Sequence, residues 1–156
     1  WSQQWQQAVH LLGCRLRGPQ RRMSETACIS ACSKASQWQA ALAVFRDPHI
    51  MRRANTRTFN AVLSGFGTSG KSGMAARLIT EMQDVTVEPL WFVAPDRQTY
   101  TWAIKSCVLS GRWELALDYL EEMSERKIEG DDGHFGDAAE ACKNGGQPEI
   151  AEILRS

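Results

Sequence analysis

The sequence predicts an all-α fold, a solenoid of stacked helical hairpins, and three observations support it. First, one position recurs along the chain at intervals of 33, 34, 41 and 35 residues. Its occupants are Trp5, Trp38, Ser72, Trp113 and Pro148. Second, two segments share an aromatic residue, a turn glycine, an alanine and a methionine at identical offsets; the pairs are Phe59/Tyr100, Gly70/Gly111, Ala75/Ala116 and Met82/Met123. Third, the apolar residues of these segments have helical spacing. A period of this size is typical of helical hairpins that bury their apolar faces on one another.

Residues 56–82 illustrate the expected repeat. Its first helix should carry an apolar stripe, because Phe59, Val62, Leu63 and Phe66 fall at positions i, i+3, i+4 and i+7. Gly70 would end this helix in the left-handed conformation. A second helix would then bury its own apolar positions, which are Ala75, Ala76, Leu78, Ile79 and Met82.

The segment Gly65–Ser72 also fits the phosphate-loop pattern GxxxxGK[ST]. A phosphate loop needs a buried strand before Gly65, and its backbone amides and lysine would hold phosphates beside magnesium. The helical spacing of the preceding residues disfavours that strand. In the downstream segment, Gly70-Lys71 is matched by Gly111-Arg112, where no phosphate loop is possible. We therefore interpret the motif as a repeat boundary and expect no bound nucleotide.

The repeats divide the chain into one helical-repeat domain, residues 1–156. We expect a partial repeat at 1–21, full repeats at 22–55, 56–96 and 97–131, and a partial repeat at 132–156, with a loop inserted at 90–94. The first helix of repeat 22–55 should run from about Ser24 to Lys34, with Cys28, Ile29 and Cys32 inward. In the last repeat, the buried stripe should be Phe135, Ala138, Ala139 and Cys142, with Pro148 beginning the second helix. The chain opens at Trp1 inside a repeat, so we expect it to be part of a longer protein.

The cysteines and histidines do not form a recognisable metal motif. The five cysteines include no CxxC pair, and Cys32, Cys107 and Cys142 share one repeat position, which favours core thiols in a reducing compartment. Cys28 and Cys32 are four residues apart and could share a metal, but no histidine pair accompanies them. We predict His10, His49 and His134 at the surface or in turns, and we expect no metal and no cofactor. No apolar run reaches the ~18 residues of a membrane-spanning helix.

The net charge of zero hides an asymmetry along the chain. Residues 1–78 hold 11 Lys and Arg against two acidic residues, a charge of +9, and the remainder carries the matching −9. A basic half favours a polyanion, whether nucleic acid or an acidic protein surface. In the alternative interpretation, most of these charges lie on solvated helix faces.

The inserted loop is apolar, with the sequence Leu90-Trp91-Phe92-Val93-Ala94 between two prolines. Two interpretations are open. The loop either folds back over the adjoining helices, or Leu90, Trp91 and Phe92 anchor a partner protein.

With these features, the units resemble pentatricopeptide repeats over essentially the whole chain. The resemblance rests on the segments around Phe59-Asn60 and Tyr100-Thr101, the Gly-Lys and Gly-Arg turns, Glu81-Met82, Glu122-Met123, and the endings Val87-Glu-Pro89 and Ala94-Pro95-Asp96. The Trp-x-x-Leu-Gly-x-x-Tyr pattern of the tetratricopeptide family, which shares this architecture, is absent.

The resemblance implies a right-handed superhelix whose first helices line a concave face. Members of the family mostly bind single-stranded RNA in mitochondria or plastids, one base per repeat. The residue after the first-helix aromatic and the last residue before the next repeat together recognise each base. By position, these base-recognition pairs are Thr26 with Asn55, Asn60 with Asp96, and Thr101 with Asp131, which would prefer adenine, uracil and guanine respectively. Met23, Arg57 and Gln98 would flank the bases.

The resemblance therefore favours sequence-selective RNA binding in organellar gene expression. The alternative is a scaffold subunit of an organellar ribosome, photosystem or respiratory complex, which would bind proteins through the solenoid and the loop Leu90–Ala94. A nucleotide-hydrolysing enzyme is disfavoured, because no apolar strand ends in an aspartate for magnesium and no other catalytic constellation stands out. The sequence leaves open which organelle and which partner are involved.

Overall fold

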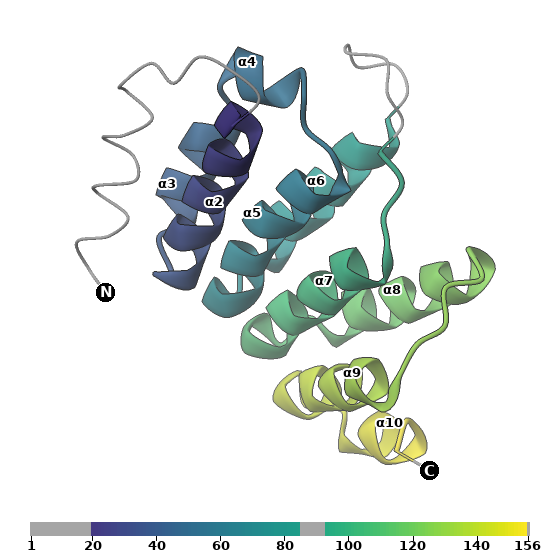
Figure 1. Ribbon diagram of the computed structural model, residues 1–156. Coiled ribbons are helices and arrows are strands. Elements are labelled where there is room, and N and C mark those ends of the chain that lie inside the picture. The colour runs from purple at the N-terminus through teal and green to yellow at the C-terminus, as the bar shows by residue number, and fades with distance from the viewer. Residues whose placement is uncertain (1–19, 85–92, 156) are drawn as a thin grey trace.

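The computed structural model describes residues 20–84 and 93–155, with the backbone alone at residues 20–24. Within these ranges every regular element is a helix (Figure 1). The helices are α2 (Gln20–Lys34), α3 (Trp38–Phe45), α4 (Pro48–Met51), α5 (Thr56–Ser69), α6 (Ser72–Gln83), α7 (Arg97–Ser110), α8 (Trp113–Glu125), α9 (Asp132–Asn144) and α10 (Pro148–Ile153). Residues 1–19, the side chain of Met23, and the predicted anchors Leu90, Trp91 and Phe92 lie outside the described residues.

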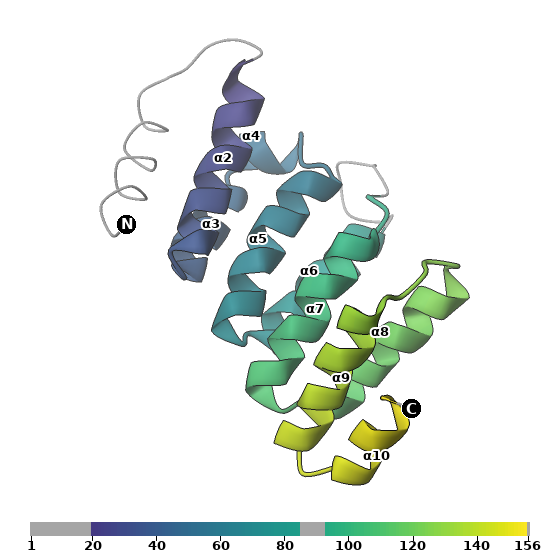
Figure 2. The same ribbon diagram turned by 60° about the horizontal axis from the view of Figure 1, so that its bottom comes forward.

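The helices form two layers. One layer consists of α2, α5, α7 and α9, which lie side by side (Figures 1 and 2). Helices α3, α6, α8 and α10 pack behind them, each joined by a short turn to its partner in the first layer. Each antiparallel hairpin therefore packs on the next, and α4 is a single turn between two of them. This arrangement confirms the predicted all-α solenoid of helical hairpins.

Local sequence fixes both ends of α5 and α7. Gly70 ends α5 at φ 63°, and Gly111 ends α7 at φ 64°. Glycine adopts this left-handed backbone without the strain that a Cβ atom would cause. At their first turns, Asn55 and Asp96 accept hydrogen bonds from the backbone N–H of the third helical residue in a capping box. The hairpin turns predicted at the two glycines are confirmed.

The core lies between the two layers and contains the predicted apolar stripes. Val62, Leu63 and Phe66 of α5 are at most 1% exposed. Phe59 packs edge-on against Phe45, with ring centroids 4.9 Å apart. Ala116 has no exposed surface, as expected for a small residue where two helices approach closely.

The four described cysteines, Cys28, Cys32, Cys107 and Cys142, are buried free thiols. Burial raises the pKa of Cys28 to about 12 and that of Cys107 to about 11. These thiols therefore stay protonated at neutral pH and behave as small apolar residues. For these four positions the predicted core role is confirmed.

Two predictions about α9 are wrong. Phe135 is 42% exposed rather than buried. In the described part of the chain, α10 packs against α9 around Ala139 and Cys142 and leaves Phe135 uncovered. His134 is 3% exposed rather than at the surface, because it is the third residue of α9 and turns its side chain into the capping box.

The phosphate-loop interpretation of Gly65–Ser72 fails. Helix α5 continues through Gly65 and Gly67, where that interpretation needs an open loop. Packing accounts for both glycines. A Cβ atom at Gly65 would lie 2.9 Å from Ser33 Oγ of α2, and one at Gly67 would lie 3.0 Å from Trp102 Cε3 of α7. The two glycines thus allow α2, α5 and α7 to approach closely.

Glutamates of the second-helix layer link successive repeats. Glu81 of α6 pairs with Arg46, with 2.8 Å between the charged atoms, and Glu122 of α8 accepts a hydrogen bond from Gln83 at 2.6 Å. These glutamates stand in the Glu-Met dipeptides that carry part of the family resemblance. They therefore help to fix the stacking of one hairpin on the next.

Candidate functional site

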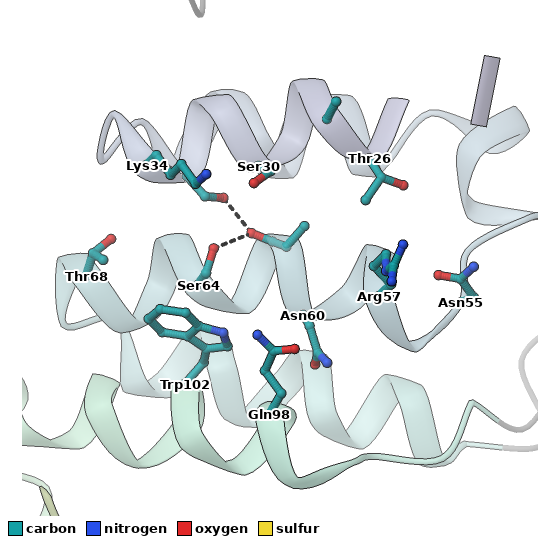
Figure 3. Close-up of a pocket in the computed structure, with 13 residues that line it drawn as sticks. Thr26, Ser30, Lys34, Asn55, Arg57, Asn60, Ser64, Thr68, Gln98 and Trp102 are labelled. Carbon is teal, nitrogen blue, oxygen red and sulfur yellow. Dashed lines mark hydrogen bonds between the residues drawn. The ribbon is translucent and has the colours of Figure 1, made fainter. Parts of the chain in front are cut away.

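A groove of about 620 Å³ runs over α5, between α2 and α7 (Figure 3). It lies on the layer of first helices, where the family resemblance places the concave binding face. Its lining residues come from all three helices and from the turn before α5. They are Thr26, Ala27, Ser30, Ser33, Lys34, Asn55, Arg57, Asn60, Ala61, Ser64, Thr68, Gln98 and Trp102.

The middle of the groove is open because the α5 residues there are small. Ala61 and Ser64 form part of its lining, and Gly67 adds no side chain. Ser33 and Ser64 both donate hydrogen bonds to the Ala61 carbonyl, at 2.6 and 2.8 Å (Figure 3). The bond from Ser33 joins α2 to α5, whereas the bond from Ser64 lies within α5. In this part of the lining, hydrogen bonds therefore hold the serine hydroxyl groups in place.

The lining is suited to an anion with hydrogen-bonding edges. None of its residues is acidic, whereas Lys34 and Arg57 supply two exposed cations. Threonine and serine hydroxyls, together with the amides of Asn55, Asn60 and Gln98, supply donors and acceptors. Trp102 supplies the one aromatic ring among the lining residues. The cations are complementary to phosphate, the hydroxyl and amide groups to base edges, and the aromatic ring to base faces.

Five of the residues predicted to contact RNA line this groove together. They are Thr26, Asn55, Arg57, Asn60 and Gln98. Asp96, Thr101 and Asp131 stand outside the lining, at the N-terminal ends of α7 and α9. In the last repeat, Gly136 occupies the position equivalent to Asn60 and Thr101 and offers no side chain.

The pair Asn60 and Asp96 is joined directly. Asn60 Nδ2 donates to Asp96 Oδ1 at 2.9 Å, and Asn60 Oδ1 accepts from the Thr99 hydroxyl at 2.7 Å. Asn60 is only 5% exposed. Burial alone would raise the pKa of the Asp96 carboxyl, but hydrogen bonds from Asn60 and Thr99 outweigh it and lower the pKa below its usual value. Both polar atoms of the Asn60 amide are thus held in one orientation.

The pair Thr101 and Asp131 is joined through His134. Thr101 Oγ1 lies 2.9 Å from His134 Nε2, and Asp131 Oδ1 lies 2.6 Å from His134 Nδ1. The Asp131 carboxylate also pairs with Arg97 of α7. The backbone N–H of His134, its side chain and Arg97 together lower the pKa of Asp131 to about 2. Asp131 is therefore ionised throughout the physiological range.

Thr26 and Asn55 differ from the other two pairs. Both side chains border the groove, but among the described residues no hydrogen bond connects them. Asn55 Oδ1 instead accepts from the backbone N–H and the hydroxyl of Thr58, each at 3.1 Å. Of the three pairs, this is the one whose two side chains are not linked by hydrogen bonds among the described residues.

Sequence reasoning missed two residues of this face, Trp102 and His134. Trp102 follows a predicted recognition residue directly and shares its repeat position with Ala61, so an alignment of the repeats would have revealed an aromatic ring at an otherwise small position. His134 shares its position with Thr58 and Thr99, which the same alignment would have identified as capping-box residues.

In the part of the chain that the structure describes, no helix is long and apolar enough to cross a membrane. No group of three His, Cys, Asp or Glu residues in that part is arranged to hold a metal ion.

Comparison with known proteins agrees with this architecture. The family model described as PPR repeat matches residues 26–47, 57–85 and 99–128, more than half of the chain. A mitochondrial pentatricopeptide repeat-containing protein of Arabidopsis thaliana is 25% identical over 129 residues, which are 82% of this chain and 18% of the relative. The chain thus spans about a fifth of the length of that relative. From its three matched repeats and its stacked hairpins, the chain belongs to the pentatricopeptide repeat family.

Proposed function

We propose that this chain is a non-enzymatic module that binds single-stranded RNA along the groove over α5. The observation that carries the proposal is the composition of the groove lining. Two cations, no carboxylate, and many hydroxyl and amide groups surround a space of about 620 Å³. Cations attract the phosphate backbone, whereas short polar side chains distinguish bases by their donor and acceptor edges.

The hydrogen-bonded pairs support sequence selectivity. Asp96 and Thr99 hold the Asn60 amide in one orientation, so little conformational entropy is lost when it meets a base. By the family's rule, the pairs at Thr26, Asn60 and Thr101 prefer adenine, uracil and guanine. The chain would then select a short RNA with one favoured base at each of three positions.

The setting that we propose is organellar gene expression. The Arabidopsis relative is named as a mitochondrial protein. The family works in mitochondria or plastids, and this chain follows the family in binding RNA rather than in catalysing a reaction.

The test is the salt dependence of binding to fluorescently labelled single-stranded RNA, measured by anisotropy. Affinity should fall steeply with salt, because phosphate contacts release counterions. Arg57→Ala should weaken binding to all sequences alike and reduce the salt slope by about one. Arg77→Ala is the matched control, because Arg77 is an exposed cation on α6, in the other layer. Equal effects of the two substitutions would contradict binding in the groove.

A second variant tests selectivity. Asn60→Thr should shift the preference of its repeat from uracil toward guanine, since it recreates the combination of threonine and aspartate found at Thr101 and Asp131. An unchanged preference would remove Asn60 from the recognition residues.

A scaffold role in an organellar ribosome, photosystem or respiratory complex is the second candidate. It is favoured by apolar side chains at the surface, since Leu109 is 67% and Ile153 is 72% exposed. A scaffold would bind a partner protein through such residues and through Leu90, Trp91 and Phe92. Replacing Trp91 and Phe92 by serine would then detach the chain from its assembly in a co-purification experiment, and Asn60→Thr would have no effect.

A further inference from the structure

Trp102 stands at a groove-facing position that is small on the two preceding first helices, α2 and α5. The equivalent residues are Ala27 on α2 and Ala61 on α5, both of which also line the groove. On α9 the equivalent residue is Asp137. The repeat itself therefore does not require an aromatic side chain here. The indole forms part of the α7 wall of the groove, beside Gln98 and across from Ser64 (Figure 3).

The indole is held in place by the backbone of α5. A Cβ atom at Gly67 would lie 3.0 Å from Trp102 Cε3 and 3.1 Å from the Trp102 carbonyl oxygen. Any side chain at Gly67 would therefore displace the ring or separate the two helices. Half-buried and seated on a glycine, the ring forms a rigid aromatic surface beside the groove.

A cation accompanies the ring. Lys105 Nζ lies 5.5 Å from the centroid of the Trp102 ring, within the range of a cation–π contact. Lys105 is exposed and lies one helical turn beyond Trp102. Burial raises the pKa of the Asp137 carboxyl on α9, and the positive charge of Lys105 lowers it by a smaller amount.

We propose that Trp102 and Lys105 form a stacking platform for one RNA base: the base takes the place of the Lys105 ammonium over the indole ring, and the displaced ammonium binds the adjoining phosphate. The proposal deepens the proposed function and rests on it. It adds a contact that differs in kind from the base-recognition pairs. Stacking tolerates every base, so the platform supplies affinity rather than sequence selectivity, with purines bound more tightly because of their larger π surface.

The experiment compares the wild-type chain with Trp102→Leu and Trp102→Phe by RNA anisotropy. Loss of a stacked base should weaken binding by roughly 5- to 100-fold in Trp102→Leu, while Trp102→Phe should retain most of the affinity. Leucine keeps the apolar contact with α5, and thermal unfolding confirms that the variant is folded. Trp113→Phe on α8 is the control for a tryptophan of the other layer and should bind as the wild type does.

A series of RNAs with one abasic nucleotide at each position in turn completes the test. One abasic position should weaken wild-type binding by the same factor as Trp102→Leu, and it should cause no further loss in that variant. The platform alone would be contradicted if Trp102→Leu bound RNA as tightly as the wild type while Arg57→Ala still weakened binding. If the wild-type chain binds no RNA at low salt, the proposed function itself fails.

Discussion

Hairpins α5/α6 and α7/α8 share their helix caps and their turns but differ in the residues that face the groove. Each first helix begins with a capping box and ends at a left-handed glycine. Where α5 has Ala61 and Ser64, α7 has Trp102 and Lys105. The helix caps and turns are thus shared by the two hairpins, whereas these two groove-facing positions differ. A helix with small side chains at these positions, beside a helix with large ones, produces a groove without any change of fold.

The two hairpins also differ in how their base-recognition pairs are joined. In the first, Asn60 bonds directly to Asp96 and to the hydroxyl of Thr99. In the second, the larger imidazole of His134 lies between Thr101 and Asp131. A direct bond between two side chains makes each depend on the other for stability, so the loss of one partner should cost more in the first hairpin.

The largest effect is expected at Asp96. Asp96→Ala should lower the free energy of unfolding by about 2–4 kcal/mol, since it removes the N-cap of α7 and leaves the Asn60 amide without its acceptor. Asp131→Ala should cost less, because the backbone N–H of residue 131 would still donate to His134 Nδ1, at 3.2 Å in the wild type, whereas the Asn60 amide loses its acceptor. Urea unfolding of both variants measures the difference. Asp96→Asn is the control and should retain most of the stability, and equal losses at Asp96 and Asp131 would contradict the comparison.

The next effect concerns the glycines of α5. Gly65→Ala should destabilise the chain by about 1–3 kcal/mol, because the new methyl group would meet Ser33 of α2. Gly136→Ala in α9 has nothing within 4 Å of the new atom and should instead stabilise by roughly 0.5–1 kcal/mol through helix propensity. Thermal unfolding measures both. A stabilising effect of Gly65→Ala would show that α2 and α5 do not need this close approach.

A smaller effect is expected in acid. The folded-state pKa of Asp131, about 2, lies below its unfolded value near 3.9. The ionised carboxylate therefore adds stability above about pH 4, and this stability is lost as the pH falls toward 2. In His134→Thr the pKa of Asp131 should rise, although the backbone bond to residue 134 remains. Carbon-detected NMR titration of the Asp131 carboxyl measures the shift, and an unchanged pKa would show that the imidazole contributes nothing to it.

The smallest effect is expected at the turn between α5 and α6. Lys71 Nζ lies 5.5 Å from the centroid of the Trp38 ring, an exposed contact, so Lys71→Ala should cost no more than about 0.5–1 kcal/mol. Calorimetry with ATP and GTP should show no binding to either the variant or the wild type. Nucleotide binding that disappears in Lys71→Ala would revive the phosphate-loop interpretation of this segment.

Sequence reasoning predicted features that depend on residues near one another in the chain. Gly70 and Gly111 could be placed because a turn after a helical stripe needs a positive φ. Features that depend on a neighbouring helix were missed. His134 is buried because Thr101 of α7 faces it, and Phe135 is exposed because α10 packs farther along α9, around Ala139 and Cys142. The groove itself depends on Gly67 and Trp102, which are 35 positions apart and meet only when α5 and α7 pack.

The capping boxes also constrain how binding specificity can change in evolution. Asn55, Asp96 and Asp131 each cap the N-terminus of a helix, and each belongs to one of the base-recognition pairs that the family resemblance predicts. Only a few residue types, chiefly serine, threonine, aspartate and asparagine, begin a helix well. The need to cap a helix therefore limits which substitutions are tolerated at these positions, whatever base they would favour. Most new specificities should arise instead at the partner position inside the helix, and Thr101 is freer to change than Asn60 because its aspartate is held by His134 and Arg97.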